Sequence, residues 1–234
     1  IFGCTIANNA SDATNDIDFA SGTAVDSTNL WYMVASALTK RLDSTWVVGT
    51  NQGGLFSGAV ANGTYHCFII MRPDTGVVDA GFSTSAVAAD RPGAYTLYRR
   101  IGSIVRASAA ILGFSQDGDE FLLKVPRLDI NTTVGTAAAL QTLTVPLGIK
   151  VKAITDLNAN VGAGTSIMWS SPDQTDTAPV VNGLGLTFAS STYSHNGKLI
   201  RTNTSGQIRA RSTQAATSIL GTTHGWIDGR GRTG

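Results

Sequence analysis

The chain has 234 residues and a formal net charge of +1, and it is 42% hydrophobic but only 14% charged. Its apolar content is high enough to form a core, which excludes intrinsic disorder. Its 17 basic residues are spread along the chain, so nucleic-acid binding has little electrostatic support and we expect no nucleic-acid partner. No apolar run reaches the roughly 18 residues that a bilayer-spanning segment needs, and we expect no membrane insertion.

Helical periodicity is nearly absent, and the longest candidate segments, Val34–Leu42 and Val134–Leu140, could form two or three helical turns at most. The chain begins at Ile1, without an initiator Met or a signal-peptide pattern, so we expect it to start inside a longer gene product. Elsewhere short β-rich runs alternate with clusters of Gly, Pro, Asn and Asp. This spacing is typical of an all-β sandwich or barrel.

The first half of the chain predicts two hairpins and one long strand. The run from Tyr65 to Met71 is almost continuously apolar, which is typical of a strand buried on both faces, and the turn residues after it predict a hairpin over 65–82. An Asp-Gly turn at Asp117-Gly118 predicts the second hairpin. The strands expected in this half are 65–71, 77–82, 95–105, 111–115 and 120–125.

The second half predicts further strands separated by longer loops. Residues 158–164 are expected to be a loop, Asn203–Gly206 the turn of a third hairpin, and Gly229–Gly234 a frayed end. The strands expected here are 143–154, 166–169, 185–189, 198–202 and 207–212. With about ten to twelve strands in total, the predicted fold is an antiparallel, jelly-roll-like β-sandwich.

Two cysteines cannot define a disulfide framework. Cys67 lies in the apolar run at 65–71, so we interpret it as a small buried hydrophobe. A bridge between Cys4 and Cys67 is left open.

Catalytic and metal sites are not indicated by the sequence. Asp117, Asp119 and Glu120 are close in sequence, but they belong to a hairpin tip, where solvent exposure disfavours a general acid. A Gly-x-Ser-x-Gly elbow is absent, and zinc-type spacings of Cys or His are absent too. We expect His66 to be buried and neutral, and His195 and His224 to lie in turns. The chain is therefore predicted to be a non-enzyme without a cofactor or metal.

Glycan binding is the chemistry that the sequence favours most. Such sites place an aromatic face against a sugar ring and use amides and carboxylates for its hydroxyls. Two candidate groups fit, and their residues are Trp31, Tyr32, Trp169, Asp173 and Gln174. A Trp in a β-sandwich is more often part of the core, so both interpretations of these residues stay open.

Arg99 and Arg100 are adjacent in an expected strand. Their side chains should therefore point to opposite faces of the sheet. We expect one of the two to pair inside the protein or at a subunit contact, and the other to stay hydrated.

Several blocks of the sequence carry a family resemblance that runs almost end to end. The blocks are Ile6–Phe19, Ala37–Asp43, Val48–Leu55, Pro73–Ser85, Tyr98–Gly102, Phe114–Phe121, Ser171–Gln174 and Gly225–Arg232. Together they resemble a set of tailed-bacteriophage virion proteins, described as tail-fibre or minor structural proteins. The resemblance implies the C-terminal module of a longer polypeptide and a location in the virion tail. It offers no catalytic residues.

The resemblance also implies partners and a domain plan. Phage fibre and tip proteins are commonly trimeric, so we expect a homotrimer that contacts other virion tail proteins. Residues 1–22 would connect to the rest of the virion protein, and 23–234 would form the β-sandwich domain. Whether 156–234 completes that sandwich or forms a second lobe stays open.

Three functions follow as hypotheses. The first is a non-enzymatic adhesion module at the distal end of a tail fibre or tail tip, which binds host-surface glycan. The second is a purely structural baseplate or capsid decoration protein without a ligand. The third is a polysaccharide depolymerase, which would need two facing carboxylates in a groove.

Overall fold

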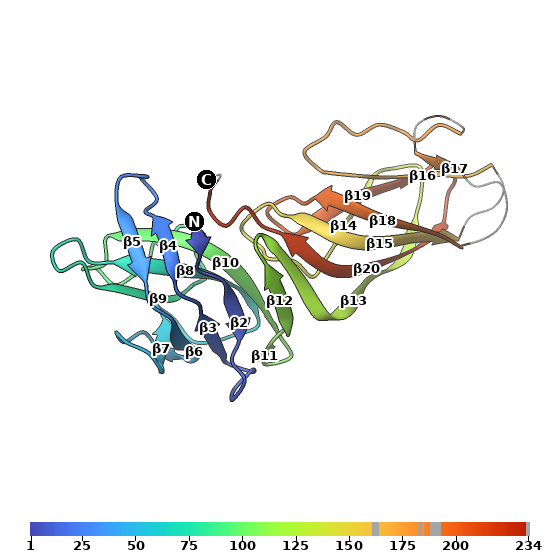
Figure 1. Ribbon diagram of the computed structural model, residues 1–234. Coiled ribbons are helices and arrows are strands. Elements are labelled where there is room, and N and C mark those ends of the chain that lie inside the picture. The colour runs from blue at the N-terminus through green and yellow to red at the C-terminus, as the bar shows by residue number, and fades with distance from the viewer. Residues whose placement is uncertain (161–163, 182, 184, 188–192, 233–234) are drawn as a thin grey trace. The chain divides into compact units, whose positions relative to one another are not determined.

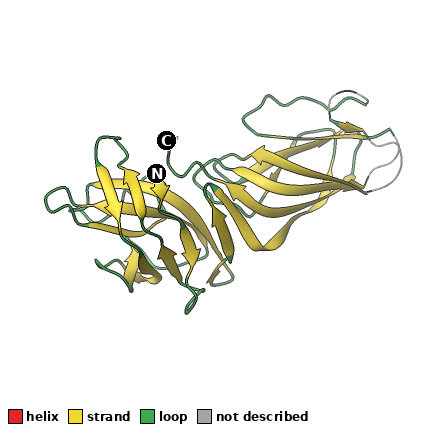
Figure 2. Ribbon diagram, in the orientation of Figure 1, coloured by secondary structure: helices red, strands yellow, loops and turns green. Residues whose placement is uncertain are grey.

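A computed structural model of the chain describes residues 1–160, 164–181, 183, 185–187 and 193–232. Every regular element in these residues is a β-strand, which confirms the predicted all-β class (Figure 2). Within the same described residues, no helix is long and apolar enough to cross a membrane.

Neither candidate helical segment forms a helix. Residues 34–42 contain the end of β5 (Tyr32–Ala35) and the start of β6 (Leu38–Thr45), and side-chain burial alternates along β5 with the period of two that a strand requires. Residues 134–140 run from the end of β13 (Glu120–Val134) through a short loop into β14 (Ala139–Thr142). Their alanines favour a helix locally, but the pairing of β14 with another strand overrides that preference.

The chain forms two compact units. Unit 1 contains residues 1–124 and 228–234, and unit 2 contains residues 125–227. The predicted boundary at residues 22 and 23 falls inside β4 (Gly22–Val25), whose paired strands belong to unit 1. Unit 2 begins at residue 125, and residue 156, the start of the possible second lobe, lies inside its strand β15 (Lys152–Asn160).

Unit 1 is built from two sheets (Figure 1). In spatial order, the three-stranded sheet contains β1 (Phe2–Gly3), β4 and β5. The eight-stranded sheet contains β11 (Ala110–Ile111), β10 (Leu97–Ala107), β8 (Gly63–Met71), β9 (Val78–Ser83), β7 (Gln52–Leu55), β6, β3 (Asp16–Phe19) and β2 (Ile6–Asn8). Its pairings are antiparallel except for β6 with β7 and β7 with β9, which are parallel.

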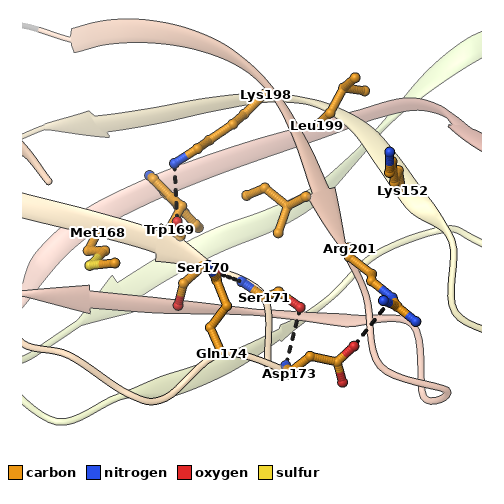
Figure 3. A pocket seen from close by; sticks show the side chains of 11 residues that line it. Lys152, Met168, Trp169, Ser170, Ser171, Asp173, Gln174, Lys198, Leu199 and Arg201 are labelled. Carbon is orange, nitrogen blue, oxygen red and sulfur yellow. Dashed lines mark hydrogen bonds and ion pairs between the residues drawn. The ribbon is translucent and has the colours of Figure 1, made fainter.

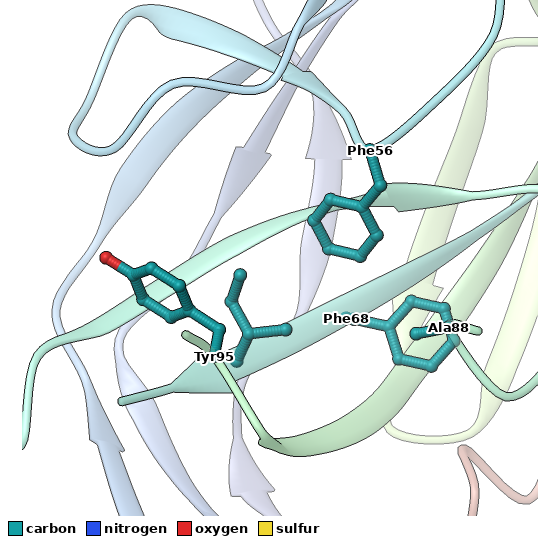
Figure 4. Packing of buried hydrophobic residues seen from close by; sticks show 5 residues of the cluster. Phe56, Phe68, Ala88 and Tyr95 are labelled. Carbon is teal, nitrogen blue, oxygen red and sulfur yellow. The ribbon is translucent and has the colours of Figure 1, made fainter. Parts of the chain in front are cut away.

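The core of unit 1 is centred on β8, which is buried at every position from Tyr65 to Met71 as the sequence predicts. The predicted hairpin over 65–82 is confirmed as β8 and β9, and the long strand as β10, which pairs with β8. A cluster on one side of β8 contains Phe56, Phe68, Ile70, Ala88 and Tyr95 (Figure 4). The three-stranded sheet packs against β8 and β9 through β5, whose Met33 and Ala35 are buried.

The second predicted hairpin is confirmed as β12 (Phe114–Asp117) with the first residues of β13. Its two-residue turn is Gly118-Asp119, one position later than predicted, because Asp117 still pairs with Glu120. Gly118 has a φ of 55°, in the left-handed region that glycine tolerates best.

Unit 2 is a sandwich of two sheets (Figure 1). One contains, in spatial order, the later part of β13, β20 (Thr217–Ile227), β15 and β18 (Tyr193–Arg201). The other contains β14, β19 (Gln207–Ser212), β16 (Ser166–Ser170) and β17 (Leu186–Thr187). Buried and less buried residues alternate along β15 and β19, as strands with one inner face require.

Several predictions for this half need correction. The expected loop at 158–164 is wrong in its first part, since β15 continues to Asn160, and residues 161–163 lie outside the described residues. The expected strand at 143–154 starts only at Lys152, and residues 188–189 of the expected strand 185–189 also lie outside the described part.

The third predicted hairpin is wrong as well. A turn does form at Asn203–Gly206, but β18 pairs with β15 while β19 pairs with β14 and β16. The turn therefore connects the two sheets of the sandwich instead of joining two paired strands.

Candidate functional site

The predicted glycan-binding residues fall into two groups, one in each unit. Trp31 and Tyr32 belong to unit 1, at the loop that joins β4 to β5. Trp169, Asp173 and Gln174 belong to unit 2, at the end of β16 and in the loop that follows it. Each group is therefore a separate candidate site.

The loop in unit 1 is fixed from within by Asp26, whose side chain is buried. Its carboxylate accepts hydrogen bonds from the Thr28 hydroxyl (2.7 Å) and from the backbone N–H groups of Thr28 (3.1 Å), Leu30 (2.9 Å) and Trp31 (3.0 Å). Burial alone would raise the pKa of Asp26, but these hydrogen bonds outweigh burial and lower it. The charged carboxylate thus holds the loop in one conformation.

Arg99 holds the same loop from β10. Its guanidinium donates to the carbonyl oxygen of Val25 (2.6 Å), to that of Asp26 and to the side-chain oxygen of Asn29. It also donates to the carbonyl of Gly231 (2.6 Å). Arg99 is 8% exposed. The prediction that the other arginine stays hydrated is wrong, because the Arg100 side chain is only 11% exposed and forms an ion pair with Asp228.

The fixed loop displays large apolar side chains to solvent. Leu30, Trp31 and Tyr32 are 78%, 50% and 77% exposed, and we refer to these three residues as the aromatic apex. A hollow of about 90 Å³, lined by residues that include Asn29, Arg99 and Arg232, lies beside the loop and offers polar groups.

The apex continues onto the outer face of the three-stranded sheet. Phe2 pairs with Thr23, and Thr23 pairs with Val34, so Phe2 and Val34 lie in one row across the sheet. Phe2 is 82% exposed and Val34 is 69% exposed. Unit 1 therefore carries an exposed apolar surface next to the apex, and an exposed surface of this kind is typical of a binding or assembly site.

The site in unit 2 is a groove of about 540 Å³ where β16 and the loop after it approach β18, which we call the β16–β18 groove (Figure 3). All the candidate residues of unit 2 line it: Trp169, Asp173 and Gln174. However, Trp169 is only 3% exposed. Its indole belongs to the core and does not present a ring face for stacking.

The cationic side chains of the groove were not predicted from the sequence. They are Lys152, Lys198 and Arg201. Lys198 is half-buried and donates to the carbonyl oxygen of Trp169 (3.1 Å), and burial lowers the pKa of its ammonium group. Lysine alternates with apolar residues along 150–153, and this pattern indicates an exposed cationic face. It does not indicate that β18, which carries Lys198 and Arg201, is the neighbouring strand.

The loop beside the groove is held by charges at its rim. Asp173 accepts from Lys150 (2.5 Å) and lies 3.3 Å from Arg201, and the hydrogen bond from Lys150 lowers the pKa of Asp173. Arg209 donates to the carbonyls of Gln174 (2.9 Å) and Pro172 (3.3 Å). This loop therefore has a defined shape.

The remaining aromatic and titratable candidates have structural roles. Trp226 is buried in unit 2, and Trp46 packs against the core cluster of unit 1. His66 is buried, and its Nδ1 lies 2.8 Å from the Ser103 hydroxyl, as expected for a core histidine. His195 and His224 lie in strands β18 and β20, so their predicted turns are wrong.

The carboxylates of the Gly118-Asp119 hairpin do not form a pair in a groove. Asp117 is exposed, and Asp119 forms an ion pair with Arg232. Within the residues that the structure describes, no group of three or more His, Cys, Asp or Glu side chains could hold a metal ion.

Comparisons of this chain with protein-family models, with curated proteins and with solved structures find no match.

Proposed function

We propose that this chain is a non-enzymatic module of a bacteriophage tail that binds saccharide on the host surface, at the distal end of a tail fibre or at the tail tip. The observation that carries the proposal is the aromatic apex: exposed Trp31 and Tyr32 on a loop that Asp26 and Arg99 hold in place. A loop whose backbone is already fixed loses less conformational freedom on binding. Such a display is expected of a recognition site.

The chemistry of the apex suits a sugar. The apolar face of a sugar ring stacks on Trp or Tyr, while its hydroxyls need polar partners. Asn29 and Arg232 at the neighbouring hollow supply an amide and a guanidinium. A shallow site of this kind binds weakly, and copies in a homotrimer would raise the effective concentration for the second contact. The virion location and the trimer rest on the resemblance of the blocks named above.

The test is binding of the purified chain to an array of bacterial lipopolysaccharides and capsular polysaccharides. We expect Trp31→Ala and Tyr32→Ala each to weaken array binding at least tenfold with an unchanged melting temperature, because both side chains are exposed. Val87→Ala removes another exposed apolar side chain of unit 1 (59% exposed) and should leave binding unchanged. Equal binding by all variants would refute the proposal.

A purely structural role in a baseplate or capsid is the second candidate. It is favoured by the row of Phe2 and Val34 beside Tyr32, an apolar face that could be covered by another virion protein or a second copy. Light scattering separates the two roles. An assembly that dissociates when Val34 is replaced by Ser, together with a failure to bind any saccharide of the array, would favour the structural role.

A further inference from the structure

We infer that the β16–β18 groove of unit 2 binds an acidic saccharide, one whose sugar rings carry carboxylate groups. This inference rests on the proposed function for its ligand class, but it concerns a different site and different residues. The groove and the aromatic apex can therefore be tested separately.

The first argument is charge. The described lining of the groove includes Lys152, Lys198 and Arg201, and Asp173 is its carboxylate. Asp173 is already engaged by Lys150 from outside the lining, at 2.5 Å. The groove thus retains an excess of positive charge in a chain whose net charge is only +1. A concave surface with charges of one sign attracts ligands of the opposite sign.

The second argument is the position of Lys198. Adjacent residues of a strand point to opposite sides, so Lys198 turns towards Trp169 on β16 while Leu199 turns away from it (Figure 3). The Lys198 ammonium is half-buried and donates to a neutral carbonyl, and burial disfavours its charge. The Trp169 carbonyl carries no negative charge. A bound carboxylate would therefore give the Lys198 ammonium a charged hydrogen-bond acceptor.

The third argument is the placement of Lys152 and Arg201. They are directly paired residues of β15 and β18, so their side chains lie side by side on one face of the sheet. The distance from Arg201 to the Asp173 carboxylate is 3.3 Å, which is longer than the 2.5 Å from Lys150 to the same carboxylate. Together with Lys198 on the other face, these cations lie on both sides of the edge strand β18. This arrangement suits a chain of repeating negative charges better than a single ion.

The fourth argument is the remaining lining. Met168 and Leu199 provide apolar surface for sugar rings, and Ser170 and Gln174 provide polar atoms for hydroxyls. The volume of about 540 Å³ is in the range of sites for small organic ligands. An inorganic anion would leave most of this volume unused.

The experiment measures binding of oligogalacturonate by calorimetry, with neutral maltohexaose and polyphosphate as comparison probes. We expect oligogalacturonate to bind with an affinity that falls as salt is added, and maltohexaose not to bind. Lys198→Met and Lys152→Met should each weaken oligogalacturonate binding about tenfold. Lys124→Met removes the same charge at an exposed position of unit 1 and should change the affinity less than twofold.

The outcomes distinguish this inference from the proposed function. Trp31→Ala should leave oligogalacturonate binding unchanged, since Trp31 belongs to unit 1. Unchanged affinity in both Lys198→Met and Lys152→Met would overturn the inference, as would equal binding of polyphosphate, which would indicate a site for any polyanion. If Lys198→Met lowers the melting temperature, the oligogalacturonate affinity of Lys152→Met decides the test, because Lys152 is exposed.

Discussion

The guanidinium of Arg100 donates to both carboxylate oxygens of Asp228, a residue 128 positions later in the chain. The Arg100 Nη2 to Asp228 Oδ1 distance is 2.8 Å, and the two side chains are only 11% and 2% exposed. Asp228 begins the segment that returns to unit 1 after unit 2 is complete. This ion pair therefore attaches the C-terminal segment to β10 in unit 1.

Arg230 also attaches the C-terminal segment to the rest of unit 1. It is 4% exposed, and its guanidinium donates to the carbonyls of Ile101 (2.8 Å), Gly3 (2.8 Å) and Cys4 (2.5 Å). The predicted fraying of Gly229–Gly234 is therefore wrong for residues 229–232, and 233–234 lie outside the described residues. Residues 98–102 and 225–232 are thus in contact within unit 1.

We expect Asp228→Asn to destabilise unit 1 by about 3–5 kcal/mol, because it leaves the Arg100 guanidinium buried without its counter-charge. Hydrogen exchange of the β8 and β10 amides, followed by mass spectrometry, would report the change for unit 1 alone. Asp74→Asn is the matched control, since it breaks the exposed pair of Asp74 with Arg72. Similar exchange in both variants would contradict the assigned role of Asp228.

The loop below the aromatic apex should respond to acid. The pKa of Asp26 is lowered in the folded protein, so its carboxylate stabilises the loop above the ordinary value of 3.8, and this stabilisation is lost as the pH falls through the lowered pKa. We expect the backbone amide signals of Leu30 and Trp31 in NMR spectra to titrate with a midpoint below 3.8. Asp26→Asn should abolish this transition. A midpoint at or above the ordinary value would mean that the hydrogen bonds to Asp26 do not control the loop.

Sequence patterns predict the elements of this fold that are stabilised locally. The hairpin of β8 and β9 and that of β12 and β13 join at short turns, so turn chemistry and hydrophobic runs identify them. The same rules fail at Asn203–Gly206, where the turn is correct but its two strands join different sheets. Partner choice depends on long-range packing, which local patterns do not contain.

The candidate sites show the same limit. Trp31 and Tyr32 are exposed in agreement with the glycan interpretation, whereas Trp169 is buried in agreement with the alternative core interpretation. Neighbouring residues do not separate the two cases, because burial of a Trp depends on the sheet packed against it. Lys198 was overlooked for a related reason: its position beside Trp169 arises only when β16 and β18 come together from the two sheets of unit 2.

Close packing leaves little room for a side chain at Gly81 in β9. A Cβ atom at Gly81 would lie 2.3 Å from the Phe56 ring and 2.6 Å from the Gly54 carbonyl oxygen. We expect Gly81→Ala to destabilise unit 1 by about 1–3 kcal/mol through overpacking. Gly93→Ala is the matched control, because its Cβ would meet no atom within 4 Å. Equal denaturant midpoints for the two variants would show that the Phe56 ring moves aside at no cost.

Both cysteines should behave as protected thiols. Cys4 and Cys67 are each 0% exposed and free, and burial raises the pKa of both thiols, which disfavours the reactive thiolate. We expect no reaction of the native protein with a thiol reagent on the time scale of minutes, and two reactive thiols after denaturation without a reductant. The denatured Cys67→Ala variant should have one reactive thiol. If no thiol of the denatured protein reacted, Cys4 and Cys67 would be joined by a disulfide. Unit 1 would then be held together by a covalent bond as well as by the contacts of Arg100 and Arg230.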